Sequence, residues 1–165
     1  IIGASVNAVA IEIINRIETI VGKGNYSFVI MRSSYDFRNN HSVKVIQNGR
    51  SLSRKEMRKE LEALDYVLLP YNRKKYKISA SGAFCDALNG EIPMLMLDSP
   101  LLKYYNKQKI GWQFSNVDDM VDFIVGILRD ESTQMLEENE EIKRNIKRLK
   151  EIQREYNKKE IINIL

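Results

Sequence analysis

The 165-residue chain has few of the residues that build disulfides and metal centres: one cysteine, Cys85, and one histidine, His41. A single cysteine excludes an internal disulfide, and a lone histidine without a cysteine cluster predicts no metal site of the usual kind. Cys85 falls within an expected helix, where a buried small residue is a more ordinary interpretation than a nucleophile. No apolar run approaches the roughly 18–20 residues that span a bilayer.

The N-terminus also lacks the basic and apolar regions of a signal peptide. The opening "IIGAS" resembles the end of a strand already under way, so we expect the chain to be part of a longer protein cut at a domain boundary.

The composition is that of a folded domain with a mild excess of positive charge. Hydrophobic residues make up 44% of the chain, enough for a core, and the formal net charge is +4. Much of the excess lies in "NRKKYK" and in a C-terminal segment that is also rich in glutamate. The second pattern is typical of a solvated helix face, so we expect no nucleic-acid partner.

Hydrophobic spacing predicts alternating helices and strands. Residues 5–22 place apolar side chains at helical intervals and end at Gly22 and Gly24, while "YSFVIMRSS" and "HSVKVIQNG" are typical of strands. Ser53 and Glu56 form a capping box that opens a helix carrying Met57, Leu61 and Leu64 on one side. A later helix is expected to begin at Ser115 or Asn116, and one or two amphipathic helices to follow Glu131.

Two strands without polar residues, "YVLLP" and "PMLML", predict a parallel sheet buried on both faces, and "IGWQF" predicts a final strand. The expected fold class is therefore α/β, a Rossmann-like parallel sheet flanked by helices with a long C-terminal helical segment. We expect the Rossmann-like sheet and its helices to form one ligand-binding domain over residues 1–130. Residues 131–165 would form an extension packed on it or on a missing N-terminal domain.

A basic loop between "YVLLP" and the short helix "SGAFCDALNG" is the expected ligand site, because ligands of such sheets bind beyond the carboxyl ends of the strands. Gly90 is expected at the C′ position that ends this helix. At its start, the free N–H groups of Ser81, Gly82 and Ala83 would face an anion, and Gly82 has no Cβ to obstruct it. Further ligands for a diphosphate would be the Ser79 hydroxyl and the charges of Arg73 and Lys77.

An ordinary serine cap and a solvated basic loop remain the alternative interpretation of these residues. Neither the P-loop pattern GxxxxGK[ST] nor GxGxxG occurs, which disfavours a nucleoside triphosphatase and a dinucleotide dehydrogenase.

The stretch "DYVLLPY … SASGAFCDALNGEIPML" resembles the C-terminal, donor-binding domain of GT-B fold glycosyltransferases of the glycosyl transferases group 1 type. The resemblance covers about residues 1–130. The residues that match the family's motif are Asp65, Pro70, Tyr71, Gly82, Asp86, Ala87, Leu88, Gly90 and Pro93.

The resemblance implies that a nucleotide diphosphate sugar binds at the start of this helix, with Asp86 in the place of the glutamate that contacts the ribose. It implies no cofactor and no metal ion, and it assigns no catalytic residue. Two departures stand out: Ile78 occupies the position of a family glutamate that contacts the donor sugar, and the basic pair usual after the first strand is missing.

The function implied is the donor-binding half of a glycosyltransferase in polysaccharide or glycoconjugate synthesis, with the acceptor held by an N-terminal domain of the same chain. Such an enzyme would be cytoplasmic, with association with the inner face of a membrane left open. Two alternatives remain: a sugar-nucleotide epimerase of the same fold, and a non-catalytic α/β interaction domain.

Overall fold

The computed structural model describes residues 8–30, 35–46, 53–70, 82–99, 105, 107–129 and 133–164. In chain order the elements are α1 (Ala8–Val21), β1 (Phe28–Ile30), β2 (Val43–Val45), α2 (Arg54–Glu62), β3 (Val67–Leu69), α3 (Gly82–Gly90), β4 (Met94–Leu97), β5 (Gly111–Phe114), α5 (Val117–Arg129) and α6 (Thr133–Ile164).

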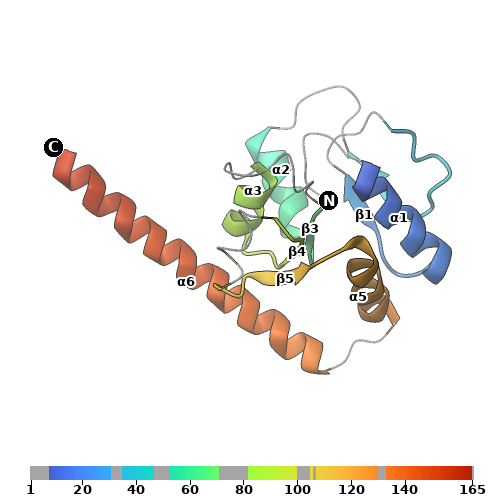
Figure 1. The fold of residues 1–165 in the computed structure, drawn as a ribbon. Coiled ribbons are helices and arrows are strands. Elements are labelled where there is room, and N and C mark those ends of the chain that lie inside the picture. Colours follow the sequence, from blue (N-terminus) through green and yellow to red (C-terminus); the bar gives the residue numbers. More distant parts are fainter. Residues whose placement is uncertain are drawn as a thin grey trace.

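Every strand pair in the described residues is parallel. β3, β4 and β5 form one sheet in that order, and β1 and β2 form a second (Figure 1). The predicted α/β class with a parallel arrangement is confirmed, although the strands are divided between two sheets. Ile30 of β1 nevertheless shares a core with Leu68 of β3, so the two sheets are packed into one body.

The central strands send alternate side chains into two separate cores, as the absence of polar residues predicted. On β3, Val67 and Leu69 face one core while Leu68 faces the other. The first core is covered by α2, α3 and α6, and the second by α1 and α5. The sheet is thus enclosed between two layers of helices.

α1 and α5 bury apolar stripes against each other and against the second core. The stripe of α1 consists of Ala10, Ile13, Ile14 and Ile17, whereas Ile20 is exposed. α1 ends as predicted at Gly22, whose φ of +70° favours glycine and whose N–H donates to the carbonyl of Glu18 at 2.9 Å.

The predicted helix caps are present in α2 and α5. Ser53 and Glu56 exchange both hydrogen bonds of the capping box. For α5 the cap is Asn116, the second of the two expected positions, because its Oδ1 accepts the N–H of Asp119 at 2.8 Å.

The expected end of α3 was wrong by one residue. The left-handed residue is Glu91, with φ of +58°, and Gly90 still belongs to the helix. Glu91 and Ile92 donate to Leu88 and Ala87 at 3.2 and 3.0 Å, the bond pattern of a Schellman motif. A Cβ at Gly90 would lie 2.9 Å from Cδ1 of Ile92, so a larger residue there would require the Ile92 side chain to shift.

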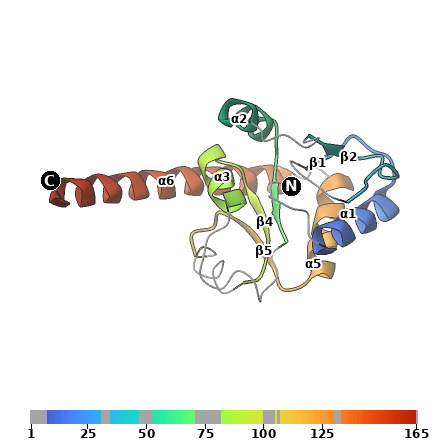
Figure 2. The ribbon, with the colours of Figure 1, turned by 90° about the horizontal axis from the view of Figure 1, so that it is seen from above.

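The segment after residue 131 contains one long helix, α6, of 32 residues. Its first half packs on the domain, with Ile142 and Ile146 buried in the first core and Leu149 against it. Its second half extends away from the body (Figures 1 and 2), and Ile152 and Tyr156 are 55% and 63% exposed. The apolar spacing predicted the helix, but the described residues cover only part of its apolar stripe.

Candidate functional site

α3 is the helix that follows the carboxyl end of β3. The parallel-sheet topology predicted a ligand site at the start of this helix. β3 ends at Leu69 and is followed by the buried Pro70, and α3 starts at Gly82. Four predicted diphosphate ligands lie outside the described residues: Arg73, Lys77, Ser79 and Ser81. Ile78, at the position of the family glutamate, also lies outside them.

Gly82 and Ala83 occupy the first turn of α3, where the backbone N–H groups have no partner inside the helix. Within the described part of the chain, no hydrogen bond satisfies either N–H group. Among the described residues, no atom lies within 4 Å of a Cβ added at Gly82, which is exposed, whereas Ala83 is buried. The first turn of α3 therefore offers free N–H donors of the kind that bind anions at helix N-termini.

Asp86 lies one turn further along α3 and is half-buried. Partial burial raises the pKa of its carboxyl group from the ordinary value of 3.8. Among the described residues it has neither an ion-pair nor a hydrogen-bond partner. A carboxylate that loses hydration without gaining a partner is suited to accept hydrogen bonds from a ligand.

Cys85, between these residues, is exposed, so the expectation of a buried cysteine was wrong. The inward face of α3 consists of Ala83, Phe84, Ala87 and Leu88, and Cys85 falls on the outer face.

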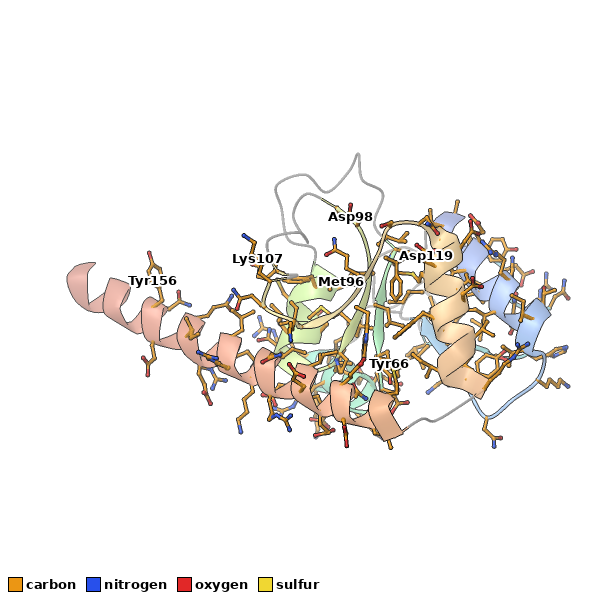
Figure 3. The ribbon with its side chains drawn as sticks, turned by 60° about the horizontal axis from the view of Figure 1, so that its bottom comes forward. Tyr66, Met96, Asp98, Lys107, Asp119 and Tyr156 are labelled. Carbon is orange, nitrogen blue, oxygen red and sulfur yellow. The ribbon has the colours of Figure 1, made fainter. Side chains whose placement is uncertain are left out.

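Three polar residues at the carboxyl ends of β4 and β5 escaped the sequence prediction. The Nε2 group of Gln113 donates to Oδ1 of Asp98 at 2.6 Å, and Ser99 is 1% exposed. Oε1 of Gln113 is buried and has no hydrogen-bond partner among the described residues. Figure 3 shows Asp98 at this end of the sheet and Tyr66 at the other. The available signal was the change from apolar to polar at "MLMLDS".

A polar cavity of about 380 Å³ lies elsewhere, between the second half of α1 and the segment 35–42. It does not include any of the predicted site residues, and nothing in the sequence pattern predicted it.

The described ranges contain neither a metal-binding cluster nor a membrane-spanning helix. There, His, Cys, Asp and Glu do not form a group of three or more placed to hold a metal ion. In those ranges the helices are also too short or too polar to cross a bilayer.

Comparisons with protein-family models, with curated proteins and with solved structures found no match. What α3 and its neighbours can bind is therefore inferred from the residues of this chain.

Proposed function

We propose that the chain is the nucleotide-sugar-binding part of a glycosyltransferase of the GT-B kind, with the nucleotide diphosphate at the start of α3. The diphosphate would accept hydrogen bonds from the N–H groups of Gly82 and Ala83. Ser79, Ser81, Lys77 and Arg73 of the preceding segment would supply further donors and positive charge.

The observation that carries the proposal is the half-buried carboxylate of Asp86, which has no partner among the described residues and lies one turn from the start of α3. A nucleoside diphosphate presents an anionic group and, beside it, a ribose with two hydroxyl donors. The anion suits the positive end of the helix dipole, and the hydroxyls suit an acceptor that lacks a partner.

The chemistry expected of this site is stabilisation of the departing diphosphate. Charge develops on the phosphate oxygens as the bond to the sugar breaks, and fixed N–H dipoles with lysine and arginine side chains can stabilise that charge without a metal ion. The acceptor and any base acting on it would come from a further domain. We therefore expect the isolated 165-residue chain to bind nucleotide and to transfer no sugar.

In the cell, such an enzyme would work in the cytoplasm, either free or at the inner face of a membrane, where nucleotide sugars meet the acceptors of polysaccharide or glycoconjugate synthesis. This location follows from the proposed reaction and from no other feature of the chain.

Calorimetric titration with UDP, GDP and their sugars tests the proposal. We expect at least one nucleoside diphosphate to bind with a millimolar or lower Kd. Its 2′,3′-dideoxy analogue should bind more weakly, because it has no hydroxyl to donate to Asp86. Asp86→Ala should abolish this preference for ribose, while Asp122→Asn, an exposed aspartate of α5, should preserve it. Absence of binding to every nucleotide at millimolar concentration would refute the donor-site assignment.

A further inference from the structure

The polar cavity beside α1 has the size of a small-molecule site. Its volume is about 380 Å³, near the lower end of the roughly 300–1,000 Å³ typical of ligand pockets. One wall is the second half of α1, and the other is the segment 35–42 that precedes β2.

The two walls are fixed to each other by Glu18. Its Oε1 accepts the N–H of Ser42 at 2.7 Å, and its Oε2 accepts Nδ2 of Asn40 at 2.6 Å. The same Nδ2 group also donates to Oδ1 of Asn15 at 3.0 Å. Glu18 therefore holds the two walls of the cavity against each other before any ligand binds, so binding need not order these walls.

Several groups around the cavity have unused hydrogen-bonding capacity. The ammonium of Lys23, the amide of Asn39 and the imidazole of His41 have no partner among the described residues, and all three line the cavity. At its edge lies the ring of Tyr35, which is 44% exposed. Its orientation is fixed by an edge-to-face contact with the buried Phe37, at 4.8 Å between ring centroids and 67° between planes.

The charges around the cavity favour a neutral ligand. Among the described lining residues, Glu18 carries the one carboxylate and Lys23 the one ammonium, so these charges cancel, and the cavity adjoins the negative end of the α1 dipole at Gly22. An anion would be opposed by that dipole and by Glu18. A metal cation would lack ligands, because the described residues contain no cluster of carboxylates or imidazoles suited to it.

A neutral ligand that both donates and accepts hydrogen bonds is a polyhydroxylated one. We propose that the cavity between α1 and the segment 35–42 binds a neutral saccharide unit, with hydroxyl groups on Asn39, Lys23 and His41 and a sugar face against the ring of Tyr35.

This site is distinct from the start of α3. The cavity lies at the amino-terminal ends of β1 and β2, where the N–H of Phe28 donates to the carbonyl of Ser42 at 2.7 Å. α3 instead follows the carboxyl end of β3. The saccharide site therefore does not depend on the proposed function, and either can fail while the other stands.

The test is a nuclear magnetic resonance titration of the 165-residue chain with methyl glucoside, methyl galactoside and N-acetylglucosamine, and with inorganic phosphate as an anionic comparator. We expect at least one sugar to cause saturable shifts of the backbone amides of Lys23 and of residues 39–42, at millimolar concentration. Phosphate should leave these amides unchanged.

Variants of the lining residues then identify which side chains contact the sugar. Asn39→Ala and Lys23→Met should each raise the Kd about fivefold, the loss expected for one hydrogen bond. Both side chains are exposed and unpartnered within the described residues, so the fold should survive. Lys55→Met on the exposed face of α2 should leave the Kd unchanged. The proposal is overturned if no sugar gives saturable shifts here, if phosphate gives them instead, or if the two cavity variants bind like the parent.

Discussion

The replacement Gly82→Ala separates the role of this glycine in ligand binding from any role in folding. Gly82 is the first residue of α3, has no positive φ and would place an added Cβ in open space. The free chain should therefore tolerate alanine, with a free energy of unfolding between unchanged and about 1 kcal/mol higher.

Bound nucleotide would meet that methyl group in the path of its phosphate. Displacing the phosphate from one N–H group forfeits a charge-assisted hydrogen bond worth about 1.5–3 kcal/mol, which corresponds to a roughly 10- to 100-fold rise in Kd. The assay is calorimetric titration with UDP and GDP beside thermal unfolding of the ligand-free variant.

A matched control is Gly126→Ala in the interior of α5. Gly126 is exposed, and a Cβ there also meets nothing within 4 Å. Alanine should stabilise this helix by about 0.5–1 kcal/mol, which raises Tm by a few degrees, and the nucleotide Kd should not change. Equal binding by Gly82→Ala and the parent would refute the assigned role of Gly82. Marked destabilisation by Gly82→Ala would show that the added Cβ contacts protein atoms and would contradict the open space at this position.

The remaining predictions concern stability. In Gly111→Ala the new Cβ would clash with the backbone oxygen of Met94. We expect a loss of about 3 kcal/mol or more, seen in urea unfolding, as the β4–β5 ladder separates; an unchanged midpoint would contradict the register. Asp86→Asn should raise Tm near pH 7, because burial raises the pKa of Asp86 and the folded state loses stability as pH rises above 3.8. The gain should vanish below that pH, and a gain that persisted there would contradict the cause. Lys150, at 2.6 Å from Oε1 of Glu91, lowers the pKa of that carboxyl group. Lys150→Met should cost about 1–2 kcal/mol, fully above pH 4.5 and less as pH falls through the lowered pKa of Glu91; a cost independent of pH would mean that the ion pair contributes nothing.

Most of the fold could be predicted because its signals are local. Strands without polar residues, such as "YVLLP", can only be buried on both faces, and the structure places Val67 and Leu68 in opposite cores. The caps at Ser53 and Asn116 could be predicted because each cap bonds to a residue only three positions later in the sequence. The end of α3 was missed because Glu91 adopts a left-handed conformation that sequence rules assign to glycine. That conformation is accompanied by a non-local contact, the ion pair with Lys150.

The candidate sites also differ in whether local sequence could predict them. Gly82, Ala83 and Asp86 share one short helix, so their proximity follows from the helix alone. Their roles toward a nucleotide remain predictions. The cavity beside α1 depends on Glu18 reaching Ser42, a contact across 24 positions of sequence. Hydrophobic periodicity carries no information about such polar contacts, and no spacing rule could have found them.

Binding of a nucleoside diphosphate at the start of α3 can be measured directly. The direct measurement is the change in backbone amide chemical shifts of the isotope-labelled chain on addition of UDP or GDP, compared with uridine or guanosine. We expect saturable shifts at Gly82 and Ala83 with the diphosphates and much smaller shifts with the nucleosides, which lack the anion. Shifts confined to other parts of the chain, or equal shifts with nucleoside and diphosphate, would contradict it.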